Sequence, residues 1–134
     1  MVVRLTALLA TFALLLVPAR AACPVGQTAM LHVRIYFGLM EEDGKRVPDA
    51  AWRDFLARTV TPRFPAGFTV YAAMGQWRDL KTKVIGREPS RIVEVDAPDS
   101  RAVRAKVEEV RKTYQTRFHQ QAVGLVTEPV CGAF

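Results

Sequence analysis

The sequence predicts an α+β domain in which strands and helices follow the order strand, helix, strand, strand, helix, strand. Alternating apolar and polar residues mark strands at 31–37, 68–74 and 92–95. Apolar residues at helical spacing follow the first and the third of these strands. This order is the split βαβ pattern of ferredoxin-like folds, with a four-stranded antiparallel sheet and both helices on one face.

A charged loop and the first helix follow the strand at 31–37. The loop at 41–46 contains three adjacent acids and an Asp-Gly turn signal, but it lacks the regularly spaced oxygen ligands of a cation site. Pro48 and Asp49 suit the first turn of a helix. Pro62 ends that helix, because the residue before a proline is pushed out of the helical region.

Glycine and proline interrupt the chain between the second and the third strand. The strand at 68–74 leads into a polar turn. Gly86 and Pro89 then break the alternation that begins after this turn. We therefore expect a bulge or an edge irregularity before the third strand resumes at 92–95.

The second helix carries the clearest signals in the chain. Ser100 stands at an N-cap position, and apolar residues repeat at helical spacing from Val103 to Phe118. A last short strand is predicted at 122–126. The expected sheet order is 4-1-3-2, with the first and third strands in the centre. Another two-layer α+β sandwich is the alternative.

Residues 1–21 are typical of a secretory signal peptide. An apolar run at 5–17 follows one positive charge, and the segment 19–21 has small residues at the two positions that a signal peptidase reads. The run is too short for a membrane span, which needs about 20 residues. We therefore expect cleavage near Ala21, a secreted or periplasmic location, and one domain at 22–134 without an integral membrane segment. An uncleaved anchor or a buried first helix is the alternative.

The charge balance changes when the signal segment is removed. The chain has 19 basic and 13 acidic residues. Arg4 and Arg20 leave with the signal, so 17 basic residues oppose 13 acidic ones and the net charge falls from +6 to +4. This value indicates a mildly basic protein rather than a dedicated nucleic-acid binder, and export also argues against nucleic acid as a partner.

The two cysteines, Cys23 and Cys131, stand near the two ends of the expected domain. In an oxidising compartment such an isolated pair predicts a disulfide. The closed loop of about 100 residues corresponds to at most about 4–5 kcal/mol in the chain-entropy model. Lipidation of Cys23 is one alternative, although Arg20 stands where such signals usually have Leu or Val, and two free thiols are another.

Several short motifs cover most of this expected domain. Together they resemble the bacterial domain of unknown function 3574, whose members are small exported proteins without an established activity. The resemblance implies no catalytic residues. Pro48 stands where a capping serine is usual, and Ala66 where an aspartate is usual. The motifs are Ile35-Tyr36-Phe37-Gly38, Trp52-Arg53-Asp54-Phe55, Thr61-Pro62-Arg63-Phe64-Pro65, Gly67-Phe68-Thr69-Val70, Gly75-Gln76-Trp77 and Glu88-Pro89-Ser90.

Common catalytic and cofactor motifs are absent from the sequence. The serines, Ser90 and Ser100, do not lie in a nucleophile elbow. The histidines, His32 and His119, lie on separate elements without a second ligand at metal-binding spacing. The chain also lacks a phosphate-binding glycine loop and a dinucleotide fingerprint, so we expect neither a metal nor a cofactor.

The polar residues of the strands predict a helix-free sheet face. If the apolar residues of the first strand face the helices, the residues between them face the other way. Such a face can hold a small ligand or pack against a second subunit in a homodimer, and a solvated face is the alternative. The residues expected there are His32, Arg34, Tyr36, Thr69, Tyr71 and Glu94.

The expected sheet order makes one contact on this face predictable. The first and third strands are neighbours in the order 4-1-3-2, and Glu94 is the acid in the middle of the third strand. We predict a direct or water-bridged contact between Arg34 and Glu94, with Tyr36 beside them.

A second group of candidate binding residues comes together if the second and third strands form a hairpin. Arg63 and Glu88 then form either a structural ion pair that closes the loop after the first helix or part of a pocket wall. In such a pocket Trp77 provides an apolar plate and Gln76 an amide that makes two hydrogen bonds. Ser90 belongs to the same group.

The sequence supports two hypotheses about function. The first is a non-catalytic exported domain that binds a small ligand or self-associates through the open sheet face. The second is a cofactor-independent enzyme of the dimeric ferredoxin-like type that acts on a small molecule. In that enzyme Arg34, Tyr36 and His32 provide anion-binding and proton-transfer groups. A pocket near Tyr36 that contains a group of shifted pKa would favour the enzyme.

Overall fold

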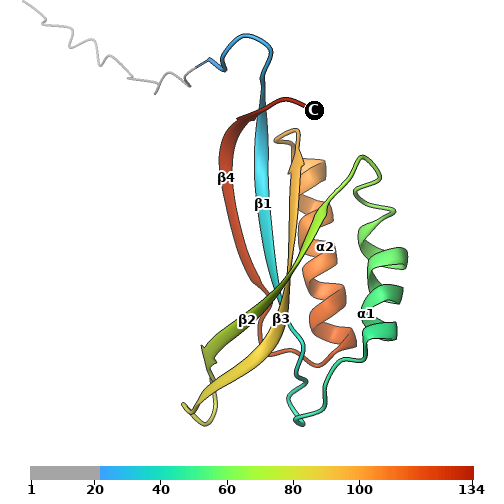
Figure 1. Ribbon diagram of the computed structural model, residues 1–134, viewed down its shortest axis with the longest axis vertical. Helices are drawn as coiled ribbons and strands as arrows, with labels where there is room; N and C mark the ends of the chain where they lie inside the picture. Colours follow the sequence, from blue (N-terminus) through green and yellow to red (C-terminus); the bar gives the residue numbers. More distant parts are fainter. Residues whose placement is uncertain (1–21) are drawn as a thin grey trace, which may run out of the picture.

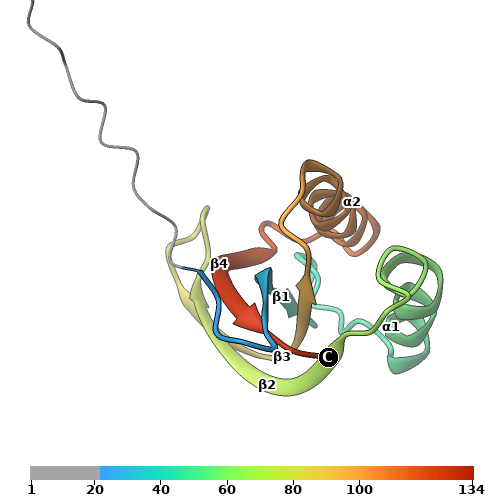
Figure 2. The ribbon, with the colours of Figure 1, turned by 90° about the horizontal axis from the view of Figure 1, so that it is seen from above.

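The computed structural model describes residues 22–134, and the secretory signal predicted at 1–21 lies outside the described residues. An antiparallel sheet carries the helices on one of its sides (Figure 1, Figure 2). Its strand order, β2-β3-β1-β4, is the predicted one, so the ferredoxin-like α+β fold is confirmed. In chain order the elements are β1 (Thr28–Gly38), α1 (Asp49–Phe55), η1 (Leu56–Val60), β2 (Thr69–Arg78), β3 (Ile85–Ala97), α2 (Arg101–Arg117) and β4 (Gly124–Gly132).

Two strands are longer than predicted, because each accommodates a proline. β3 runs without interruption through Gly86 and Pro89, so the expected irregularity there is wrong. The carbonyl of Pro89 accepts a hydrogen bond from the Leu39 N–H at 3.0 Å. The N–H and C=O of a strand residue point to the same side, so the N–H that Pro89 lacks would have pointed toward β1. At this position the β1–β3 pairing has already ended, and no hydrogen bond to β2 is lost. β4 continues past the predicted 122–126 and through Pro129, which its place at the sheet edge permits.

The helices begin and end close to the predicted signals. α1 passes directly into η1, a π-helical turn in which the Thr61 N–H donates to the Leu56 carbonyl at 2.9 Å. This helical segment ends before Pro62, as predicted. The Ser100 side chain accepts a hydrogen bond from the Val103 N–H at 3.1 Å, so the predicted N-cap of α2 is confirmed.

A cluster of buried aromatic rings joins β1 to the helices. Phe37, Phe55 and Tyr114 are fully buried, and the ring centroids of Phe37 and Tyr114 lie 4.7 Å apart in an edge-on arrangement. The Tyr114 hydroxyl donates a hydrogen bond to the Gly38 carbonyl at 2.7 Å. The end of β1 is therefore fixed against α2, and Gly38 is held in place for the site described below.

The predicted disulfide between Cys23 and Cys131 is confirmed. Cys131 lies on β4 opposite Ala29 of β1, so the bond joins the segment before β1 to the far edge of the sheet. Within residues 22–134, no helix has the length and apolar character needed to cross a membrane.

Candidate functional site

The predicted ion pair between Arg34 and Glu94 lies on the helix-free face of the sheet. Arg34 on β1 lies opposite Glu94 on β3, and its Nε donates to Glu94 Oε1 at 2.7 Å. The alternation of buried and half-buried residues along β1 places Arg34 on the side away from the helices. The predicted contact and the strand register behind it are therefore confirmed.

Neighbouring groups complete this ion pair. The Tyr71 hydroxyl donates to Glu94 Oε2 at 2.8 Å, and His32 Nδ1 lies 2.8 Å from Asp96 Oδ1. The hydrogen bonds from Tyr71 and Arg34 hold the pKa of Glu94 below its usual range. Both Glu94 oxygens have protein donors, so these residues form a satisfied cluster in the middle of the face.

Further along β1 the same face is hollow, because three neighbouring strand positions are glycines without a side chain. Gly38 lies opposite Ser90 of β3, Gly75 of β2 lies opposite Glu88, and Gly124 of β4 lies opposite Tyr36. A cavity of about 320 Å³ occupies this part of the face. It is lined by Tyr36, Gly38, Gly75, Gln76, Trp77, Glu88, Ser90, Gln120, Gln121, Ala122 and Gly124.

Aromatic rings and an amide-rich loop form the walls of the hollow. Trp77 at the end of β2 and Tyr36 on β1 supply the aromatic surfaces. A Cβ on Gly124 would lie 3.2 Å from the Cβ of Tyr36, so this glycine makes room for the tyrosine beside β4. The segment 120–122 between α2 and β4 lines the cavity as well.

Two oxygen atoms converge on the floor of the hollow at Gly38. A Cβ at this position would lie 2.7 Å from Glu88 Oε1 and 3.0 Å from Gln120 Oε1. The other Glu88 oxygen accepts a hydrogen bond from the Met40 N–H at 2.8 Å. The Gln120 amide nitrogen donates to the carbonyls of Met40 at 2.9 Å and Phe118 at 3.1 Å, which orients its Oε1.

Glu88 differs from Glu94 in its electrostatic surroundings. Burial raises the pKa of Glu88, and the hydrogen bond from the Met40 N–H opposes this shift only in part. Tyr36 and this carboxyl group line the same cavity. The hollow therefore combines an aromatic wall, a partly buried acid and a second acceptor, which is the composition of a small-molecule site.

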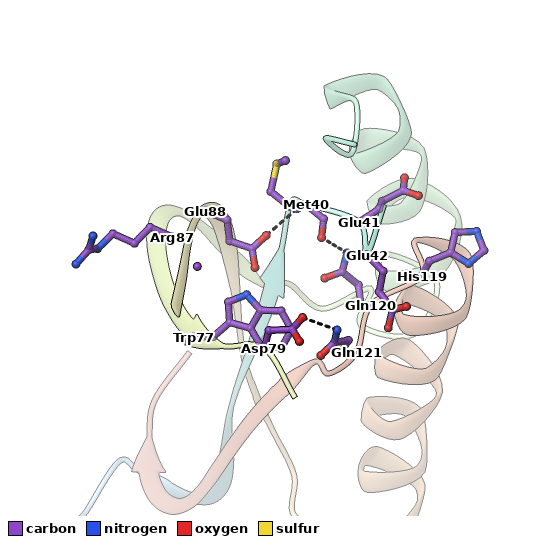
Figure 3. A pocket seen from close by; sticks show the side chains of 11 residues that line it. Met40, Glu41, Glu42, Trp77, Asp79, Arg87, Glu88, His119, Gln120 and Gln121 are labelled. Carbon is purple, nitrogen blue, oxygen red and sulfur yellow. Dashed lines mark hydrogen bonds between the residues drawn. The ribbon is translucent and has the colours of Figure 1, made fainter. Parts of the chain in front are cut away.

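A second, smaller cavity of about 170 Å³ adjoins the hollow and shares Trp77, Glu88, Gln120 and Gln121 with it (Figure 3). The Gln121 amide nitrogen donates to Asp79 Oδ2 at 2.8 Å, and its oxygen accepts from the Leu80 N–H at 3.1 Å. Gln121 thus ties the β2–β3 turn to the loop after α2. The end of this hairpin extends away from the helices, so this tie fixes its position (Figure 1).

The structure corrects the expected neighbours of Arg63. Its guanidinium pairs with Glu109 on α2 and donates to the Thr59 carbonyl at 2.7 Å. Arg63 lines a separate groove of about 600 Å³ together with the segment 64–69 and the end of β3. The expected pair between Arg63 and Glu88 is therefore wrong. Glu88, Gln76, Trp77 and Ser90 do come together in the hollow.

Sequence reasoning missed the glycines and Gln120. Gly38 and Gly75 belong to the family-like motifs, and extending the strand alternation from Tyr71 places Gly75 and Trp77 on the open face. Gln120 follows α2 in an irregular segment and had no comparable signal. Among residues 22–134, no group of three or more His, Cys, Asp or Glu side chains is arranged to hold a metal ion.

Solved structures with similar folds come from several protein classes. A phage SAM lyase in complex with S-methyl-5'-thioadenosine aligns with a TM-score of 0.63 and 16% identity, covering 78% of this chain and 90% of that one. CutA from Synechococcus elongatus, complexed with Bis-Tris, aligns with a TM-score of 0.51 and 11% identity over 80% and 87% of the two chains. A putative PII-like signaling protein from Thermus thermophilus gives 0.50 and 13% over 81% and 94%. These likenesses concern the fold.

No curated protein matches the sequence. A family model does match, over residues 32–134, a range that includes every residue lining the hollow. The chain therefore belongs to the family described as protein of unknown function (DUF3574).

Proposed function

We propose that this protein is an exported module that binds a small molecule in the hollow of its open sheet face, without catalysing a reaction. The proposal of export draws support from the disulfide between Cys23 and Cys131, since such bonds persist in oxidising compartments. The proposed domain is the part of the chain at 22–134. The fold supplies a floor of paired backbone, because all four strands meet at the hollow.

The observation that carries the proposal is the open cavity lined by Gly38, Glu88 and Gln120. A Cβ at Gly38 would lie 2.7 Å from Glu88 Oε1, so the carboxylate would have to move to admit a larger residue. Nothing in the described chain fills the cavity next to this carboxylate. A cavity of about 320 Å³ has room for roughly ten water molecules, enough for a small metabolite.

Filling the hollow tests the proposal. A Cβ on Gly75 would make ordinary contacts, 3.6 Å from Ser90 Oγ, so Gly75→Leu should fold while its side chain blocks the cavity. Ala72→Leu adds the same bulk to β2 on the other face and serves as the control. Native mass spectrometry of protein purified from its own envelope should show a retained small molecule in the wild type and in Ala72→Leu, and none in Gly75→Leu. Equal retention by all three proteins would contradict binding in the hollow.

Self-association through the same face is the other half of the proposal. Tyr71 and Val126 are each 45% exposed, and with Tyr36 they surround the satisfied ion pairs with apolar surface. Such surface favours contact with a second copy of the chain. The same mass spectra report the oligomeric state, and a protein that stays monomeric at micromolar concentration would remove this half of the proposal.

An enzyme is the second candidate, and one observation favours it. Glu88 has a raised pKa and lines the same cavity as Tyr36, an arrangement that suits proton transfer. His32 and Arg34, proposed above as catalytic partners, are engaged with Asp96 and Glu94 instead. The similarity in fold to the phage SAM lyase suggests the assay.

The assay incubates the protein with S-adenosylmethionine and follows S-methyl-5'-thioadenosine by chromatography. For a binding module we expect no release above the rate in buffer. Release that depends on Glu88, and therefore disappears in Glu88→Gln, would overturn the non-catalytic function and establish the enzyme.

A further inference from the structure

Glu88 is a carboxylate without a cationic partner in the described part of the chain. One oxygen accepts from the Met40 N–H, and the other lies over Gly38 at the floor of the cavity. Among the residues that line the larger cavity, Glu88 alone carries a formal charge. Burying an unpaired carboxylate is unfavourable, so a protein that retains one usually pairs it with a ligand or keeps it neutral.

Gln120 points independently to a ligand at the same place. The residue is 9% exposed, and both hydrogen atoms of its amide nitrogen are donated to backbone carbonyls. Its Oε1 accepts no hydrogen bond from residues 22–134 and lies 3.0 Å from the Cβ position above Gly38. Both acceptor oxygens therefore lie over Gly38 at the floor of the cavity, and no group of the described chain donates a hydrogen bond to either of them.

Acidic residues outnumber basic ones in the lining of the adjoining cavity. Glu41, Glu42 and Asp79 line it together with Glu88. The basic residues of this lining, Arg87 and His119, direct their side chains away from the cavity (Figure 3).

Some of these charges already have partners within the chain. Arg87 is occupied, because its Nε donates to the Gln76 amide oxygen at 2.9 Å. Lys81 approaches Glu42 at 3.2 Å. Asp79 accepts N–H groups of its own turn, which lowers its pKa to about 2. Glu88 is thus the acid of this region that has an oxygen in the hollow and forms no ion pair with a described residue.

Resting on the proposed function, we propose that the ligand of the hollow presents a cationic hydrogen-bond donor, such as a primary ammonium or guanidinium group, to Glu88 and Gln120. The body of this ligand lies along Trp77 and Tyr36, whose ring faces also attract cations and apolar groups. A charged donor between a carboxylate and an amide oxygen forms strong, short hydrogen bonds. It also neutralises the partly buried carboxylate of Glu88.

A structural role for Glu88 makes the opposite prediction. A protonated Glu88 can donate its proton to Gln120 Oε1 and close the gap without a ligand. In that case the hollow has no preference for cations, and replacing the acid with glutamine changes nothing in ligand choice. Matched ligands therefore separate the two explanations.

The test uses three probes with one phenyl body: phenethylamine, 2-phenylethanol and 3-phenylpropanoate, which end in a cation, a neutral hydroxyl and an anion. Titrations of the disulfide-bonded protein are followed by amide NMR at Gly38 and at the Trp77 indole N–H. We expect phenethylamine to bind at least about tenfold more tightly than 2-phenylethanol, and 3-phenylpropanoate not to bind. Glu88→Gln should remove the preference for the amine. Glu128→Gln, an equal charge change on exposed β4 of the same sheet, should keep it.

Each outcome decides a specific point. If the amine and the alcohol bind equally well and neither binds to Gly75→Leu, the inference is overturned and the proposed function stands. Retention of the amine preference by Glu88→Gln also overturns the inference. If none of the three probes shifts the resonances of Gly38 and Trp77, the proposed function fails together with the inference. The dispersion of the remaining amide signals shows whether each variant is folded.

Discussion

Two glutamates on the same face of β3 have opposite electrostatic surroundings. Glu94 lies between Arg34 of β1 and Thr69 of β2, and it accepts hydrogen bonds from Arg34 and Tyr71. Glu88 lies opposite Gly75, past the end of β1, and its hydrogen bond comes from the Met40 N–H. The pKa of the first is lowered by its partners and that of the second is raised by burial.

This difference shows how one sheet face can hold two kinds of region. Where long polar side chains stand on neighbouring strands, they satisfy one another and leave no room for a ligand. Where glycines stand on those strands, the acid has no partner and a cavity remains. The composition of the facing positions, rather than that of β3, decides which region forms.

The largest effect is expected from reduction of the disulfide. Cys131 lies opposite Ala29, near the opposite end of β1 from Gly38. The bond spans 108 residues, so reduction should lower the free energy of unfolding by up to about 4–5 kcal/mol. Urea unfolding with and without reductant measures this loss. The NMR signals of the hollow should change little under reducing native conditions, and broad changes at Gly38 would mean that the two regions are coupled.

A methyl group at Gly38 should have the next largest effect. It would lie 2.7 Å from Glu88 Oε1, so Gly38→Ala forces the carboxylate to move and disturbs its hydrogen bond from the Met40 N–H, at a cost of up to about 1–3 kcal/mol. Gly75→Ala, with its nearest contact at 3.6 Å, is the control and should cost less. Denaturant midpoints of the two variants measure the difference. Equal midpoints would show that the floor of the hollow is adaptable.

The pH dependence of stability should separate the two glutamates. The folded pKa of Glu88 is raised, so between the unfolded value of about 4.3 and the folded value the native state holds more protons, and stability falls as the pH rises. The folded pKa of Glu94 is lowered, so its contribution is present above the unfolded value and is lost as the pH falls below it. Asp79, with a pKa of about 2, titrates below this window.

Unfolding curves of the wild type, Glu88→Gln and Glu94→Gln between pH 4 and pH 7 provide the measurement. Glu88→Gln should remove the fall in stability with rising pH, and at neutral pH it should be as stable as the wild type or more so. Glu94→Gln should be less stable at neutral pH, because a neutral amide replaces the carboxylate that accepts from both Tyr71 and Arg34. Parallel curves for the two variants would contradict the comparison.

The ion-paired region could be predicted from the sequence, and the hollow could not. Strand alternation and the sheet order together predict that Arg34 and Glu94 share a face and lie on neighbouring strands. Because both side chains are long, they can still reach each other if the predicted register is slightly wrong. The hollow depends on the absence of side chains at Gly38, Gly75 and Gly124, and the alternation of apolar and polar residues gives no information about such positions. It also depends on Gln120, whose place is set by the left-handed backbone of His119 at the end of α2.

Arg63 and Pro89 illustrate the same limit. The sequence showed that Arg63 follows a helix, but its partner Glu109 comes from α2, whose packing against η1 no local pattern encodes. Pro89 is a strand breaker by type, and it is tolerated because β1 ends beside it. In both cases tertiary context overrode a correct local rule.

The smallest effect on stability is expected for Arg34→Ala, which removes the arginine from the satisfied region. The Arg34 side chain is 36% exposed, and exposed ion pairs contribute little to stability. Tyr71 still donates to Glu94 after the change, so the melting temperature should remain nearly that of the wild type.

Arg58→Ala, which breaks an exposed pair with Asp54 on the helical side, is the control. If the open face is an interface, native mass spectrometry should show weaker self-association for Arg34→Ala and none of this loss for Arg58→Ala. A large drop in melting temperature would instead mean that the arginine stem packs against Tyr36 and Tyr71 and supports the sheet itself.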